Sequence, residues 1–201
     1  MKKLTKDFYK RDTLTVAKEL IGKYIVHRVK GENLVCRITE TEAYTGIEDK
    51  ACHAYQDRRT KRTEALYMEG GHAYVFLIYG MYECMNVVTE EENTPCAVLL
   101  RGCQPISPLD VLAQQRYQKT YQQLTNYQKK NFANGPGKLT RALAITREQN
   151  KKSLLSEEFF LFENDNDSPP VIGTGPRINI EYAQEYKQKP WRFFEMEKTK
   201  S

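Results

Sequence analysis

Short turns between β-rich segments are the feature that most constrains the fold of this chain. Residues 23–29 and 34–44 flank the turn KGEN, and residues 73–79 and 82–88 flank the turn YGMY. Turns this short join antiparallel neighbours in a sheet, because parallel neighbours need a long crossover connection. Further β-rich segments follow at residues 96–101, 159–163, 176–180 and 191–195. We therefore predict a mostly antiparallel sheet.

Helices should flank this sheet. Apolar residues at helical spacing predict a helix over residues 13–21, which Asp12 would cap and Gly22 would end. The pattern predicts two more helices, at residues 108–130 and 139–146. Residues 45–71 are rich in charge and poor in β-branched residues, which indicates a long loop with room for one short helical piece. The expected class is α+β: a single domain of residues 1–201 with a curved, mostly antiparallel sheet, flanking helices and a protruding β-hairpin.

The composition narrows the class of protein. Of 201 residues, 40% are hydrophobic and 28% charged, which suits one globular domain. The basic N-terminus leads into no apolar core of the kind a signal peptide needs, so we expect neither export nor membrane insertion. Five cysteines are an odd number and have no CxxC spacing, which argues against a disulfide framework and a structural zinc site. We expect a reducing, cytoplasmic location.

Basic residues are concentrated in two parts of the chain. Residues 116–152 contain nine Lys and Arg side chains against the single acid Glu148. A second cluster comprises Arg58, Arg59, Lys61 and Arg62. A solvated helical face explains one such run equally well, but two runs favour a polyanion such as nucleic acid.

Two carboxylates lie close together on the segment RITETEAY. Residues two apart on a strand point to the same face, so Glu40, Glu42 and Tyr44 should share one face of the sheet. The residues alone leave two interpretations: this face is exposed to solvent, or one of the acids takes part in a reaction.

The hairpin tip, residues 79–82, reads Tyr-Gly-Met-Tyr. Asn, Asp or Ser is more usual in such a turn. One interpretation is that the hairpin folds back and buries the tip in the core. The other is that an apolar side chain on a projecting element enters a DNA duplex and fills the gap left by a displaced base.

Several segments resemble the alkyladenine (3-methyladenine) DNA glycosylase family. They are RITETEAY, DKACHAY, RRTKRTE, YVFLIYGMYECMNVV, AVLLRGCQPI, NGPGKLTRALAI, PRINI and KPWRFF. They occur in the family's order and cover about residues 8–195. So many ordered segments make the resemblance specific, whereas ETEAY alone would not.

The resemblance implies a monofunctional enzyme of base excision repair. Such an enzyme flips an alkylated or deaminated purine (3-methyladenine, 7-methylguanine, hypoxanthine or etheno-adenine) out of duplex DNA and hydrolyses its N-glycosidic bond. Glu42 matches the family's catalytic carboxylate, and Arg101 matches the residue that helps to hold this carboxylate and the reacting water. With an ordinary pKa of about 4.3, Glu42 would be ionised at neutral pH. No family role matches Glu40.

The resemblance also assigns contacts to the flipped base and to the opened duplex. Tyr44, His53, Phe76 and Asn86 match the base pocket, with Phe76 where the family often has tyrosine. This exchange keeps the aromatic ring for stacking and loses a hydroxyl. At the hairpin tip, the matching residue for intercalation is Tyr79, with Met81 beside it.

The remaining implied partner is duplex DNA that contains a damaged purine. Expected contacts to its backbone are Arg58, Arg59, Lys61, Arg62, Lys138 and Arg141. We expect a monomer without cofactor or metal. Three alternatives stay open: a noncatalytic DNA-binding module on the same scaffold, a hydrolase of free nucleosides, and a bifunctional glycosylase/lyase, which would need an amine nucleophile beside the sugar.

Overall fold

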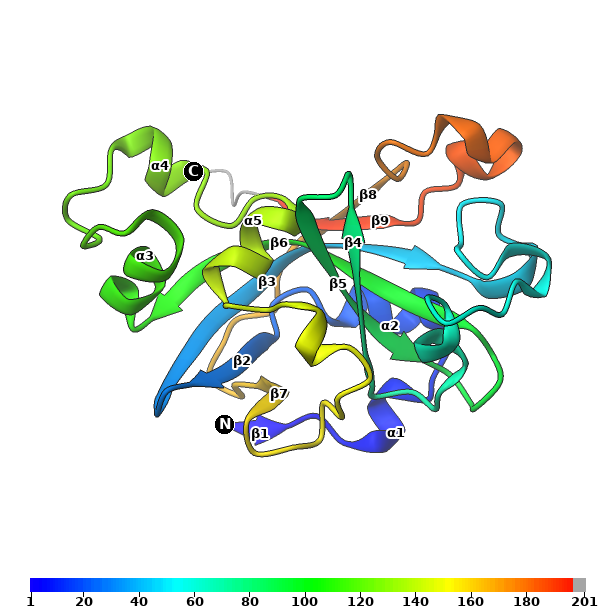
Figure 1. Ribbon diagram of the computed structural model, residues 1–201, viewed down its shortest axis with the longest axis horizontal. Coiled ribbons are helices and arrows are strands. Elements are labelled where there is room, and N and C mark those ends of the chain that lie inside the picture. Colours follow the sequence, from blue (N-terminus) through cyan, green and yellow to red (C-terminus); the bar gives the residue numbers. More distant parts are fainter. Residues whose placement is uncertain (197–201) are drawn as a thin grey trace.

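The computed structural model describes residues 1–196 and contains an antiparallel sheet of nine strands, which does not close on itself (Figure 1). The strands are β1 (Lys2–Lys3), β2 (Tyr24–Val29), β3 (Glu32–Tyr44), β4 (Ala73–Ile78), β5 (Tyr82–Thr89), β6 (Cys96–Ser107), β7 (Phe159–Glu163), β8 (Ile172–Gly175) and β9 (Arg192–Glu195). Their order is β1-β7-β2-β3-β6-β5-β4, and β9 pairs with both β3 and β8. The predicted α+β class is confirmed.

Strand β3 is the centre of this arrangement. Its alternate residues Leu34, Cys36 and Ile38 are buried in the core, as the strand period requires. One edge pairs with β6, and the other pairs first with β2 and then, from Glu40 to Glu42, with β9. The second half of β3 is therefore enclosed by strands on both sides.

Within the described residues, five α-helices and several short 3-10 turns flank the sheet. The helices are α1 (Lys6–Tyr9), α2 (Thr13–Glu19), α3 (Leu109–Tyr117), α4 (Asn126–Lys130) and α5 (Pro136–Ala142), and the 3-10 turns are η1 (Gly46–Glu48), η2 (Tyr55–Asp57), η3 (Glu64–Tyr67), η4 (Arg147–Gln149) and η5 (Glu181–Gln188). Helix α2 packs on β3 and β6, and α5 packs on β5 and β6. Within residues 1–196, no helix has both the length and the apolar character needed to cross a membrane.

Local signals placed most elements correctly. Asp12 caps α2 by accepting a hydrogen bond from the backbone N–H of Thr15 at 2.8 Å, as predicted. The region of residues 45–71 is a loop, but it contains three short 3-10 turns rather than one.

Two predicted elements are wrong, and the helix predicted at residues 139–146 is displaced, since α5 starts at Pro136 and ends at Ala142. Residues 108–130 form two helices, because Gln118 ends α3 in a left-handed conformation with φ 57° and Thr125 starts α4 with a capping box. Residues 176–180 are not a strand. Strand β8 ends just before them, and Asn179 adopts φ 60°, which takes the backbone out of the extended conformation.

The hairpin formed by β4 and β5 projects from the sheet (Figure 1). At its tip, the Tyr79 residue is 73% exposed and Met81 is 60% exposed, so the tip is not folded back into the core. Tyr79 and Gly80 have φ of 53° and 70°, and the N–H of Met81 donates to the carbonyl of Ile78. Positive φ at both central residues is the geometry of the two-residue turn that suits the twist of a hairpin.

Candidate active site

A cavity of about 490 Å³ opens beside the hairpin. Its walls come from β3, β4, β5 and β6, from the loop after β3, from the start of α5 and from residues 178–182. Of the predicted site residues it gathers Glu42, Tyr44, His53, Phe76, Tyr79, Asn86, Arg101, Lys138 and Arg141. Met81 and the four basic residues at 58–62 do not line it. Segments far apart in the sequence therefore meet in one place.

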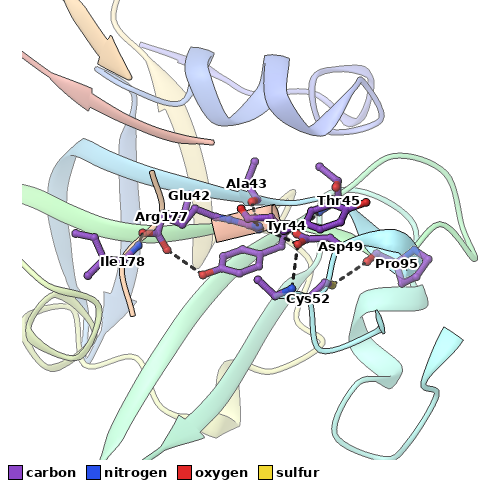
Figure 2. Close-up of polar contacts among 11 residues, drawn as sticks. Glu42, Ala43, Tyr44, Thr45, Asp49, Cys52, Pro95, Arg177 and Ile178 are labelled. Carbon is purple, nitrogen blue, oxygen red and sulfur yellow. Dashed lines mark hydrogen bonds and ion pairs between the residues drawn. The ribbon is translucent and has the colours of Figure 1, made fainter. Parts of the chain in front are cut away.

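The carboxylate of Glu42 is completely buried at this cavity. The Tyr44 hydroxyl donates a hydrogen bond to Oε2 at 2.9 Å, and the backbone N–H of Ile178 donates to Oε1 at 2.7 Å (Figure 2). Nε of Arg101 lies 3.5 Å from Oε1. We call Glu42, these two donors and Arg101 the carboxylate cluster. A buried charge needs such partners, since an unpaired one is very costly.

Burial changes the acidity of this group from what the sequence suggested. Burial raises the pKa of the Glu42 carboxyl, while the charge of Arg101 and the hydrogen bonds from Ile178 and Tyr44 act in the opposite direction. The net shift is upward. The expectation of an ordinary carboxylate is therefore wrong, because the side chain of Glu42 is completely buried. A base with a raised pKa accepts a proton more readily at neutral pH.

Glu40 lies on the same face as Glu42, as predicted, and has different partners. Its Oε1 accepts from Nε of Arg101 at 3.2 Å and from Nη1 of Arg192 at 3.0 Å. Arg101 is thus held between the two carboxylates. Glu40 fixes the orientation of Arg101 and is itself only partly buried.

Aromatic side chains form another part of the cavity wall. His53 and Phe76 meet edge to face with ring centroids 4.6 Å apart, and Tyr74 lies 5.2 Å from Phe76. Nδ1 of His53 is 2.8 Å from the Tyr74 hydroxyl. Burial, followed by the charges of Arg62 and Arg58, lowers the pKa of His53 to about 4. The imidazole is therefore neutral at neutral pH and presents an uncharged ring.

Asn86 is buried and donates from Nδ2 to the carbonyl of Tyr74 at 3.1 Å. This contact to the neighbouring strand is a structural role for the side chain. Asn86 also lines the cavity, so the same side chain both bonds to β4 and borders the space for a ligand.

The predicted backbone-contact residues lie on two sides of the cavity. Arg58 and Arg62 line a second cavity of about 360 Å³ that shares His53 with the first. Arg59 stacks on the ring of Tyr67 at 4.6 Å, and Lys61 is exposed. On the other side, Lys138 is tied to the side chain of Asn134 and Arg141 stacks on the ring of Tyr82 at 5.0 Å.

A model of the methylpurine-DNA glycosylase family matches residues 7–199 of this chain. The chain belongs to this family. The resemblance of its sequence motifs is therefore confirmed, and the protein is a DNA glycosylase, a hydrolase that cleaves N-glycosidic bonds in DNA repair.

Curated relatives match over almost their whole length. A protein of Clostridium acetobutylicum is 49% identical over 192 residues, which cover 96% of this chain and 93% of the relative. A protein of Desulfitobacterium hafniense is 46% identical over 194 residues, with 96% and 95% covered. A third, from Clostridioides difficile, is 44% identical over 200 residues, with 95% and 99% covered. Each is named "Putative 3-methyladenine DNA glycosylase".

Two buried residues beside the end of β3, close to Glu42, were not among the predicted site residues. Asp49 and Arg177 are fully buried and form an ion pair. Asp49 was part of a charged loop, and Arg177 was part of the segment PRINI, which was predicted to be a strand. An arginine within an apolar segment was the available signal, because a charge there requires a buried partner.

No set of three or more His, Cys, Asp and Glu side chains within residues 1–196 is arranged so that it could hold a metal ion. The five cysteines are buried and unpaired. Burial raises the pKa of Cys84, which lines the cavity, to about 11, so this thiol is protonated and a poor nucleophile.

Proposed function

We propose that this enzyme flips an alkylated or deaminated purine out of duplex DNA and hydrolyses its N-glycosidic bond with a water activated by Glu42. The observation that carries this proposal is a fully buried carboxylate, held by two hydrogen-bond donors and an ion pair with Arg101, at an aromatic-lined cavity beside a projecting apolar hairpin tip. A cavity of this size lies within the range of about 300 to 1000 Å³ that small-molecule sites occupy.

Glu42 acts as the general base. Cleavage places positive charge on the sugar, which a nearby carboxylate stabilises, and a water that attacks the anomeric carbon must lose a proton. Glu42 takes that proton as the bond between carbon and purine nitrogen breaks and the base leaves with the bonding electrons. A cationic lesion leaves as a neutral base, whereas a neutral lesion such as hypoxanthine leaves as an anion that takes up a proton. Glu40 fixes the orientation of Arg101. Arg101 in turn holds the carboxylate of Glu42 and the water in the positions that proton transfer requires.

Tyr44, His53 and Phe76 bind the flipped base by stacking. The neutral state of His53 supports this role, because a charged imidazole would repel a cationic purine. Cationic lesions such as 3-methyladenine and 7-methylguanine gain further attraction to aromatic faces. Asn86 lies against the edge of the purine, while its amide group stays bonded to Tyr74.

The hairpin tip fills the gap in the duplex. Tyr79 and Met81 are exposed, and insertion of such side chains between bases offsets part of the cost of unstacking. Contacts from Arg58, Arg59, Lys61, Arg62, Lys138 and Arg141 to phosphates supply affinity that does not depend on sequence. We assign residues 1–201 to one glycosylase domain that acts as a monomer on DNA in the cytoplasm.

Base release from a duplex oligonucleotide with one hypoxanthine, and from alkylated DNA, tests the proposal. The native protein should release free base from at least one of these substrates. Glu42→Gln keeps the size of the side chain and removes the base, so it should bind the same duplex and release nothing. Tight, salt-sensitive duplex binding without release by the native protein would instead indicate a noncatalytic DNA-binding module.

The same reaction distinguishes the other mechanisms. A monofunctional enzyme leaves an intact backbone with an abasic site, which breaks only after alkali treatment. Strand nicking at neutral pH would contradict monofunctional hydrolysis and indicate an amine nucleophile. Equal release from free nucleosides, without salt dependence, would contradict the roles of the hairpin tip and the basic residues.

A further inference from the structure

A buried ion pair lies directly behind the catalytic strand. Nη1 of Arg177 is 2.5 Å from Oδ2 of Asp49, and Nη2 is 2.8 Å from Oδ1, so the contact is bidentate (Figure 2). Both side chains are completely inaccessible to solvent. Arg177 Nε is buried there and has no hydrogen-bond partner among residues 1–196. Burial of two charges with one donor unsatisfied is an expensive way to stabilise a fold, which points to a different purpose.

Arg177 ties its own segment to β3 at the residue that follows Glu42. Its Nη1 also donates to the carbonyl of Ala43 at 2.9 Å. Its guanidinium lies over the ring of Tyr44 at 4.7 Å and over that of Trp191 at 5.0 Å. The arginine thus contacts the two residues of the strand that directly follow the catalytic side chain.

The loop that carries Asp49 is itself fixed. Oδ1 of Asp49 accepts from the N–H of Ala51 at 3.0 Å, and Oδ2 accepts from the N–H of Thr45 at 3.2 Å. Thr45 directly follows β3. These hydrogen bonds fix the carboxylate of Asp49 independently of Arg177. Arg177 therefore binds a rigid partner.

The residue after Arg177 provides a donor of the carboxylate cluster. The N–H of Ile178 reaches Oε1 of Glu42 at 2.7 Å. Residues 176–180 belong to no strand, and Asn179 has φ 60°, so no sheet ladder holds this segment against β3. Arg192 Nε donates to the carbonyl of Pro176 at 2.9 Å and Ile180 packs with Ala51 and Ala183, so each end of the segment has its own anchor. Between these two ends, the side chain of Arg177 anchors the segment to β3 next to Ile178.

We propose that Arg177 and Asp49 are positioning residues that hold the N–H of Ile178 on Glu42 and thereby keep the general base ionised in its buried site. This inference rests on the proposed role of Glu42. In this proposal the segment PRINI, residues 176–180, is a strap across β3. The ion pair then serves the chemistry of the site rather than the stability of the fold.

Several ionisable groups act on Glu42 together with this strap. They face it from every element packed around it: Glu40 and Tyr44 on β3, Cys84 on β5, Arg101 on β6, Arg192 on β9, and Arg177 and Tyr182 from the segment after β8. A useful variant must therefore leave the local charges unchanged. Arg177→Lys meets this condition, because it keeps the positive charge and loses the bidentate fork.

The direct measurement is the titration of the Glu42 carboxyl by NMR in protein labelled with carbon-13 glutamate, with Glu42→Gln to assign the signal. Loss of one hydrogen bond to the carboxylate favours the protonated acid, so Arg177→Lys should raise the pKa of Glu42 by about one unit. The acidic limb of kcat/KM for base release should move to higher pH by the same amount. Activity should then fall about tenfold at the lower pH and recover at higher pH.

An ester in place of the Arg177–Ile178 amide provides the second variant. Incorporation of the α-hydroxy acid analogue of isoleucine at residue 178 removes the N–H and leaves the ion pair intact. It should raise the pKa of Glu42 as Arg177→Lys does, and Arg177→Lys in the ester background should add nothing further. If Arg177→Lys does not fold, the ester alone decides: an unchanged pKa overturns the proposal.

Arg37→Lys is the matched control. Arg37 lies on the same strand and forms a bidentate ion pair with Glu195 at 2.5 and 3.0 Å, outside the cavity. It should lower Tm and leave the pKa of Glu42 unchanged. If Arg177→Lys likewise lowers Tm without moving the pKa, the pair is only structural and the proposal fails. If the native protein releases no base, the proposed function fails. In that case the NMR titration of Glu42 still tests the positioning role of Arg177 and Asp49.

Discussion

The carboxylate cluster and the hairpin tip lie at the same cavity and are built in opposite ways. Glu42 is fully buried and its two oxygens accept hydrogen bonds from Ile178 and Tyr44. Tyr79 at the tip is 73% exposed and sits in a turn made by its immediate neighbours. A reacting group must be held in place before the reaction, since reorganisation during the reaction costs rate. A group that enters DNA must have its free surface available for the partner.

This contrast predicts where substitutions act. Changes in the carboxylate cluster should affect the chemical step and its pH dependence. Changes at the tip and among the basic residues should affect the encounter with duplex DNA and the stability of the flipped state.

The largest effect should follow from Glu42→Gln. Removal of a general base costs about 100-fold to 10,000-fold in rate, so single-turnover base release should fall by that factor while the Kd for the duplex changes little. Glu40→Gln is the matched comparison, because the hydrogen bonds to Glu40 come from Arg101 and Arg192 on neighbouring strands. A loss for Glu40→Gln as large as that for Glu42→Gln would contradict the assignment of the base.

Tyr79→Ala should have the next largest effect. Stacking of an aromatic side chain on a base contributes about 1–3 kcal/mol, so kcat/KM on duplex substrate should fall by about 5-fold to 150-fold. Tm should stay the same, since the side chain has few protein contacts. Tyr79→Phe keeps the ring and should retain most of the activity. A matching drop in Tm would mean that the tip is part of the core after all.

The pH profile should report Glu42 and not His53. Burial raises the pKa of Glu42, so kcat/KM should fall about tenfold per pH unit below an inflection that lies above the usual range for a glutamate. The pKa of His53 is lowered to about 4, so His53 should give no separate inflection between pH 5 and 8. His53→Gln should weaken base binding and leave the position of the limb unchanged. A limb that disappears in His53→Gln would reverse this assignment.

The smallest effect should come from single basic residues. Loss of one phosphate contact in Arg58→Ala should lower the slope of log Kd against log salt by about 0.9. Binding should weaken to a similar extent for damaged and undamaged duplexes, because phosphates carry no information about the lesion. Lys18→Ala, an exposed lysine on α2, should leave the slope unchanged. A loss confined to the damaged duplex would place Arg58 in the base pocket instead.

Much of the fold could be predicted because its signals are local. Helix α2 begins where Asp12 caps it, and β4 and β5 meet in a turn with glycine at its centre. The failure at residues 108–130 is also local: Thr125 and Gln128 form a capping box that starts a new helix within a sequence of generally helical character. A capping residue inside a helical pattern was available as a warning.

The same distinction between local signals and contacts of distant segments applies to the candidate site. The resemblance to known glycosylase motifs named Glu42, Arg101 and Tyr79, and the alternation of a strand placed Glu40 and Glu42 on one face. Neither indicated that PRINI is a strap, because its apolar residues are typical of a strand and its buried partner, Asp49, lies 128 residues away.

By itself, the sequence determined the class of fold and the family to which the chain belongs. For the hairpin tip it left two options, of which exposure was one. Only the tertiary structure decided that the tip projects, that Glu42 is completely buried, and that Arg177 binds the carbonyl of Ala43 while the N–H of Ile178 donates to Glu42. The physical reason is that backbone preference and side-chain periodicity are properties of neighbouring residues. Burial, and the pKa shifts that follow from it, depend on which distant segments pack together.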